Sequence, residues 1–128
     1  MPLAPPWTLT DHEWLDHIWI DMSRRRQHSL TSHLQTLLMH LLKWQYQPVG
    51  RQWGHSWADT TRETRAAARA LLARHPSLRP QLPTALARAY PRACRETQRE
   101  TGLPRATFPH ACPWAAEQIL DDDFWPEG

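Results

Sequence analysis

The chain has 128 residues, the usual size of one domain, and its 41% hydrophobic residues and eight tryptophans exclude wholesale disorder. The formal net charge of +2 hides an uneven distribution, because all fifteen basic residues lie between residues 24 and 105, with only four acidic ones. Both ends of the chain are acidic. We expect these ends to neutralise part of the basic middle if they fold back onto it.

Simple patterns exclude several classes of protein. Uninterrupted apolar runs such as Leu37-Leu38-Met39 are far shorter than the ~20 residues that span a bilayer. The first residues lack the basic and apolar segments of a secretory signal. Two cysteines, Cys94 and Cys112, are too few for a disulfide framework and lack zinc-site spacing, so we expect small buried hydrophobes rather than nucleophiles. We predict one cytoplasmic domain over residues 1–128, with residues 1–8 irregular and no membrane contact.

The first helical signal, at residues 9–14, combines all three features of a helix N-terminus. Thr10 is the expected N-cap, Glu13 closes a capping box with it, and Leu9 forms a hydrophobic staple with Trp14. No Gly or Pro interrupts the following residues up to Gln47, so residues 10–47 form either one helix or two, with the only possible break near residues 23–26. The most regular apolar stripe predicts the central helix of the core, and it consists of Leu30, Leu34, Leu37, Leu38, Leu41 and Leu42.

Further helices are predicted after Pro48 and Gly50. Ser56 is the expected N-cap of a helix that ends at Arg74 and covers the core with a thin apolar face. A fourth helix is predicted to follow Ser77, with apolar residues at Leu78, Leu82, Leu86, Tyr90 and Cys94.

This fourth helix is predicted to end at Gly102, and Pro83 and Pro91 are expected to kink it. A last short helix is expected over residues 112–120, with Pro113 at its first position. No strand alternation of useful length is present. The predicted fold class is all-α, a compact bundle of four to five helices.

Seven short blocks follow one another between residues 30 and 126: LLMHLLKWQYQP (37–48), SW (56–57), PSLRP (76–80), ETGLP (100–104), TFP (107–109), CPW (112–114) and DDDFWP (121–126). In this order they resemble family 29 of the domains of unknown function, a widespread bacterial family. The resemblance implies an all-α fold and no assigned activity. Relatives usually begin with an additional aromatic-rich helix, at whose place only Trp7 and its neighbours stand. Their next helix is acidic where this chain has LDHIWI (15–20), so the resemblance implies a shortened chain with uncovered apolar surface near its start.

Histidines and carboxylates supply the only possible metal ligands. His12 with Asp16, and Glu13 with His17, are each one helical turn apart, and a third ligand would have to come from His33, His40 or residues 121–123. The alternative is an ordinary solvated helix surface with i,i+4 pairs. For His40 the alternative is a core histidine bonded to a backbone carbonyl or to Asp. We expect no catalytic residue and no cofactor, and the candidate metal ligands are His12, Glu13, Asp16, His17 and His40.

Arginines recur at three- and four-residue steps on two predicted helices. Two such basic stripes are able to contact a phosphate backbone, although no aromatic residues alternate with them to read bases. The alternative is a pair of solvated faces whose charge is balanced by Glu63, Glu96 and Glu100. The candidate nucleic-acid contacts are Arg62, Arg65 and Arg69 on one helix, and Arg88, Arg92, Arg95 and Arg99 on the other.

Three tryptophans near the start of the chain favour a different function. Trp7, Trp14 and Trp19 lie beside the place where the resemblance implies a missing helix, and Trp is enriched in interface cores. The sequence therefore predicts a non-catalytic module that binds a protein partner or a second copy of itself. Binding of nucleic acid through the arginine stripes is the first alternative, and a metal-dependent enzyme that uses the histidine and carboxylate pairs is the second.

Overall fold

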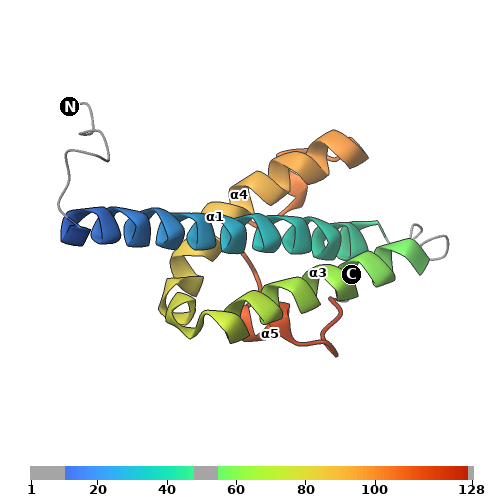
Figure 1. Cartoon of the computed structure of the whole chain (residues 1–128). Coiled ribbons are helices and arrows are strands. Elements are labelled where there is room, and N and C mark those ends of the chain that lie inside the picture. Colours follow the sequence, from blue (N-terminus) through green and yellow to red (C-terminus); the bar gives the residue numbers. More distant parts are fainter. Residues whose placement is uncertain (1–10, 48–54, 127–128) are drawn as a thin grey trace.

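The computed structural model describes residues 11–47 and 55–126, and it describes side chains in residues 23–47 and 57–126. The predicted irregular segment 1–8 lies outside these ranges. The described residues form four α-helices and two short 3-10 helices, with no strand among them. This arrangement confirms the all-α bundle (Figure 1). The helices are α1 (Asp11–Tyr46), α3 (His55–Arg74), α4 (Leu82–Thr101) and α5 (Ala116–Leu120), and the 3-10 helices are η2 (Pro76–Gln81) and η3 (Arg105–Thr107).

Helix α1 is one continuous helix of 36 residues. It passes through residues 23–26 without a break, since no Gly or Pro there interrupts its hydrogen bonds. Both α4 and α3 pack against its second half, and α1 is the central helix that the leucine stripe predicts (Figure 1). Each buried leucine contributes about 1.5–3 kcal/mol of hydrophobic free energy. All six leucines of the stripe have an exposed fraction of 0%: Leu30, Leu34, Leu37, Leu38, Leu41 and Leu42.

Helix α3 covers one side of α1 with small residues. Thr61 and Ala68 are fully buried. The buried Thr61 hydroxyl has a hydrogen-bond partner, because it donates to the Trp57 carbonyl of its own helix at 2.7 Å. The helix ends at Arg74, as predicted from the proline that follows. It begins at His55, however, so Ser56 lies within the helix and the prediction of Ser56 as N-cap is wrong.

The fourth predicted helix is divided into η2 and α4. Pro83 occupies the first turn of α4. Backbone N–H groups in the first turn of a helix have no partner within the helix, so a proline there breaks no hydrogen bond. The predicted kink at Pro83 is therefore wrong. Pro91 lies inside α4, which continues to Thr101. Gly102 then adopts φ 76°, as predicted for the residue after the helix, and its N–H donates to the Gln98 carbonyl at 2.8 Å.

The segment after Gly102 folds back over the helices and closes the core. Phe108 and Ile119 are buried there, and Phe108 meets Tyr46 at the end of α1 with ring centroids 5.3 Å apart. Helix α5 has only five residues and begins at Ala116. The prediction of a helix from residue 112 with Pro113 at its first position is therefore wrong.

Candidate functional site

The arginines of α3 and α4 lie in different surroundings, although their spacing is the same. Arg65 of α3 is completely buried. Its Nε donates to the Ile119 carbonyl at 2.8 Å, and its two Nη atoms donate to the carbonyls of Asp122 at 3.3 Å and Phe124 at 3.0 Å. Burial lowers the pKa of the Arg65 guanidinium, and the carboxylates of Asp122 and Asp121 act in the opposite direction. Arg65 therefore holds the carboxy-terminal segment and does not lie on an exposed basic stripe.

The other two α3 candidates, Arg62 and Arg69, are also engaged. Arg69 Nη1 lies 2.6 Å from Asp122 Oδ2, and Arg62 Nη1 lies 3.4 Å from Asp59 Oδ1. The Arg62 guanidinium also lies over the ring of Trp125, 5.4 Å from its centroid. Asp122, in the acidic end of the chain, thus pairs with Arg69, and Asp59 of α3 itself pairs with Arg62. The three α3 candidates do not form an open phosphate-binding stripe.

Helix α4 presents its four arginines to solvent beside α1. Two hollows adjoin there and share Arg92, one of about 210 Å³ and one of about 560 Å³. The smaller hollow brings Arg24 of α1 to the same surface. We call this surface the arginine groove, and its basic residues are Arg24, Arg88, Arg92, Arg95 and Arg99. Sequence reasoning missed Arg24, because no spacing along the chain connects it to α4.

The acidic residues expected to balance the α4 stripe have other partners. Glu96 Oε1 accepts a hydrogen bond from Gln35 Nε2 at 2.8 Å, and Glu100 forms an ion pair with Lys43. Among the described residues, no acidic side chain lines either hollow. Within that same part of the chain, the five guanidinium groups of the arginine groove make no ion pair or hydrogen bond. The groove is therefore a concentrated positive surface.

The metal candidates are not brought together in the part of the chain that is described. The side chains of His12, Glu13, Asp16 and His17 lie outside it, and the described residues contain no group of three possible ligands. His40 lies in α1 and is partly buried. Its imidazole has a lowered pKa, mainly because of burial and to a smaller extent because of the nearby positive charge of Lys43. Its Nδ1 is buried and has no hydrogen-bond partner there, so the bond expected for a core histidine is not made by this atom.

The cysteines are suited to packing rather than chemistry. Cys94 is buried and Cys112 is half-buried, and burial raises the pKa of both thiols. The Cys112 thiol donates to the Trp114 carbonyl at 3.4 Å. A raised pKa keeps a thiol protonated at neutral pH, which makes it a poor nucleophile.

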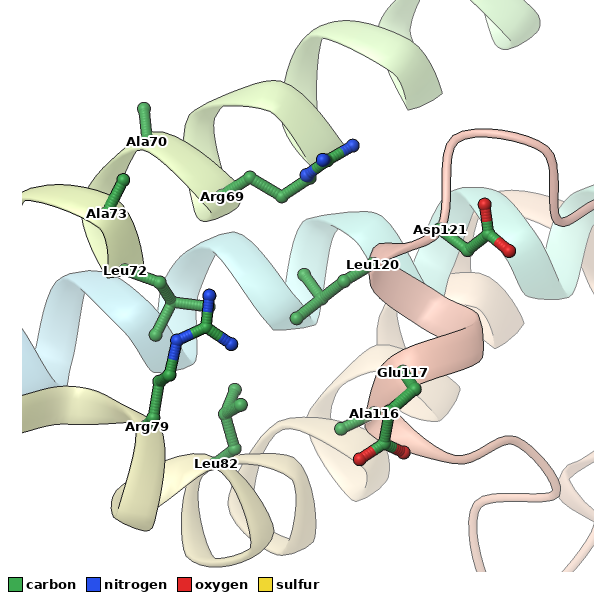
Figure 2. A pocket seen from close by; sticks show the side chains of 10 residues that line it. All are labelled: Arg69, Ala70, Leu72, Ala73, Arg79, Leu82, Ala116, Glu117, Leu120 and Asp121. Atoms are coloured by element: carbon green, nitrogen blue, oxygen red, sulfur yellow. The ribbon is translucent and has the colours of Figure 1, made fainter. Parts of the chain in front are cut away.

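A second concavity of about 550 Å³ lies among α3, η2 and α5 (Figure 2). Leu72, Leu82 and Leu120 give it an apolar floor, and Arg79 and Glu117 contribute charged groups. We call it the α3–α5 pocket. Sequence reasoning did not find it, because its residues come from three separated segments.

The tryptophans predicted to meet a partner are placed only in part. Trp7 lies outside the described residues, and Trp14 and Trp19 lie in α1, where their side chains are not described. The amino-terminal part of α1 extends beyond α3, α4 and α5 (Figure 1). Its backbone is therefore uncovered by the other described elements.

Comparison with known proteins assigns a family and no chemistry. No curated protein matches the chain, and no solved structure matches it either. No described helix has both the length and the apolar character needed to cross a membrane. The family model named "Domain of unknown function DUF29" matches residues 8–125. Since this match covers nearly the whole sequence, the chain belongs to the DUF29 family.

Proposed function

We propose that the protein binds the phosphate backbone of nucleic acid in the arginine groove. The observation that supports this function best is the gathering of five exposed arginines around two adjoining hollows without a competing carboxylate in the lining. Arginine suits phosphate because its planar guanidinium donates two parallel hydrogen bonds to phosphate oxygens. Protein binding through the tryptophans predicted from the sequence ranks second, because their side chains lie outside the described part of the chain and supply no contact to argue from.

The groove has the dimensions and chemistry of a backbone-binding surface. Arg88 and Arg99 are eleven residues apart on one helix, which corresponds to about 16 Å at 1.5 Å per residue. Gln27, Gln35 and Gln98 line the same hollows and supply neutral donors that suit phosphate and sugar oxygens. No Phe, Tyr or Trp lines these hollows in the described part of the chain, so we expect binding that does not depend on base sequence.

Salt dependence tests this proposal with the intact protein. Binding of a short duplex DNA is measured by fluorescence anisotropy at 50 mM and 200 mM salt. For four or five phosphate contacts, we expect the affinity to fall by about two orders of magnitude over this range. Binding that is absent at 50 mM salt, or insensitive to salt, contradicts the proposal.

Two matched double variants locate the binding surface. Arg92→Gln with Arg95→Gln removes two groove cations, and Arg62→Gln with Arg69→Gln removes the same charge from α3. We expect the first variant to bind at least about tenfold more weakly, because each charge-assisted hydrogen bond contributes about 1.5 kcal/mol or more. The α3 variant is expected to change affinity far less. Equal losses would show that net charge, not the groove, governs binding.

Protein interaction or self-association through the start of α1 is the second candidate. The extension of α1 beyond the other described elements supports it, together with the presence of Trp14 and Trp19 in that part of the helix (Figure 1). Light scattering at micromolar concentration tests it. We expect a dimer or larger assembly that the Trp14→Ser and Trp19→Ser double variant converts to a monomer, with unchanged circular dichroism. A wild-type monomer with quenched, buried indoles excludes this candidate.

Both candidates are binding functions that keep the cytoplasmic, bacterial setting predicted from the sequence. The free thiols of Cys94 and Cys112 are compatible with a reducing compartment such as the cytoplasm.

A further inference from the structure

The α3–α5 pocket has the form of a small-molecule site, which goes beyond nucleic-acid binding. Its volume of about 550 Å³ lies within the range of about 300–1,000 Å³ that is typical of ligand pockets. Its residues are held by α3, by η2 with the first residue of α4, and by α5 with the residue after it (Figure 2). None of the arginine-groove residues lines it. The pocket and the groove are therefore separate surfaces.

The floor of the pocket is aliphatic and well supported. Leu72 has an exposed fraction of 1% and Leu82 of 9%, so both are fixed by the core beneath them. Leu120 is half-buried and extends over the hollow from the end of α5 (Figure 2). Leu120 is the floor residue with apolar surface still exposed to water, and a ligand that covers it would remove that surface from water, which favours binding.

Two of the four charged residues that line the pocket have partners within the protein, and two have none among the described residues. Arg69 is paired with Asp122, and Asp121 Oδ1 accepts a hydrogen bond from the Asp123 N–H at 3.0 Å. Arg79 and Glu117 have no such partner among the described residues. Arg79 lies on the η2 side of the aliphatic floor and Glu117 on the α5 side (Figure 2). The pocket thus offers one cation and one anion on two sides of an apolar surface.

We propose that the α3–α5 pocket binds a short apolar peptide with free termini. The peptide carboxylate pairs with Arg79, the ammonium group pairs with Glu117, and the aliphatic side chains lie on Leu72, Leu82 and Leu120. This ligand matches both charges and the floor together. A fatty acid leaves Glu117 unmatched, and a nucleotide brings its phosphate near that carboxylate. In a single amino acid the ammonium and carboxylate groups are attached to the same carbon, whereas Arg79 and Glu117 lie on different sides of the aliphatic floor (Figure 2).

The probe is the dipeptide Leu-Leu, added to the full chain while the methyl signals of Leu72, Leu82 and Leu120 are followed by nuclear magnetic resonance. We expect saturable shifts of these signals. Amidation of the dipeptide carboxyl group and acetylation of its amino group are each expected to weaken binding at least about threefold, since each removes one charge-assisted contact. Equal binding of free and blocked dipeptides, or shifts confined to other residues, overturns the proposal.

Variants assign each terminus to its partner. Arg79→Gln is expected to weaken binding of Leu-Leu and to abolish the difference between the free and amidated forms, and Glu117→Gln is expected to do the same for acetylation. Both side chains are exposed, so these substitutions leave the core intact, which circular dichroism verifies. Arg92→Gln in the arginine groove is the matched control and keeps full dipeptide binding. An unchanged preference for free termini in both pocket variants refutes the assigned contacts.

The same variants separate this inference from the proposed function. Arg79→Gln is expected to leave DNA affinity within about twofold of wild type, because Arg79 does not line the arginine groove. Dipeptide binding without DNA binding supports the pocket alone, and DNA binding without dipeptide binding refutes the pocket alone.

Discussion

Helices α3 and α4 have the same length and similar arginine spacing, yet their arginines have opposite roles. Both helices have 20 residues and both pack against α1. The carboxy-terminal segment 119–125 covers α3, where it buries Arg65 and pairs with Arg69. No described segment covers the arginines of α4 in this way. One residue type at one spacing therefore supports the fold on α3 and forms a positive surface on α4.

The buried role of Arg65 follows from backbone chemistry. A helix end leaves its last carbonyls without partners inside the helix, and a guanidinium has donors that fan out in one plane. Arg65 reaches Ile119 in α5 and two carbonyls of the turn after it. Trp125 then lies over the same guanidinium, with its ring centroid 5.6 Å away. Arg65 thereby fixes the path of the last residues.

The largest expected effect comes from Arg65→Ala. The substitution leaves three carbonyls without their donor in the closed structure, so we expect a loss of about 3–5 kcal/mol in the free energy of unfolding. Urea unfolding followed by circular dichroism measures it. Arg88→Ala on α4 is the matched control and is expected to remain within about 0.5 kcal/mol of wild type. Similar losses in both variants would remove the contrast between the two helices.

Trp125→Ala should have the next largest effect. Trp125 is half-buried and its ring lies 4.6 Å from that of Trp44, in addition to its contact with Arg65. We expect a loss of about 2 kcal/mol, below the range for a fully buried tryptophan. The unfolding midpoint in urea measures this loss. A change under about 0.5 kcal/mol would show that the segment is held by Arg65 alone.

His40 is expected to make stability depend on pH. Its pKa is lowered in the folded protein, so the unfolded chain binds the proton more readily and stability falls as the pH drops below about 6.5. Each unit of pKa difference corresponds to about 1.4 kcal/mol once both states are protonated. His40→Leu is expected to flatten this dependence between pH 7 and pH 5 in urea unfolding. His33→Gln on the same helix is the control, and it is expected to retain the acid loss.

The smallest effect is expected for Asp122→Asn. The Arg69–Asp122 pair is more than half exposed on both sides, so its loss costs about 0.2–1 kcal/mol at low salt. The difference from wild type is expected to vanish in 1 M salt, where exposed charges are screened. Thermal unfolding at both salt concentrations measures this. A larger loss that persists in salt would mean that the pair fixes the segment as Arg65 does.

Sequence patterns predicted the helical framework because helical spacing is a local property. The leucine stripe of α1, the end of α3 before Pro76 and the left-handed Gly102 were all predicted from neighbouring residues. Errors occurred at the starts of helices. Ser56 lies one residue inside α3, Pro83 lies in the first turn of α4 and Pro113 precedes α5, so each local signal is close to a helix start but does not fix it to the residue.

The candidate surfaces were less predictable, because they combine segments that are distant in the chain. The sequence alone established the all-α class, the central leucine helix and the arginine spacing, since each depends on residues within a few turns of one another. The tertiary structure decided which arginines are buried, brought Arg24 to α4, and assembled the α3–α5 pocket. Burial and charge pairing depend on which segment covers which face of a helix. The carboxy-terminal segment packs on α3, and for this reason Arg65 is buried and Arg69 is paired.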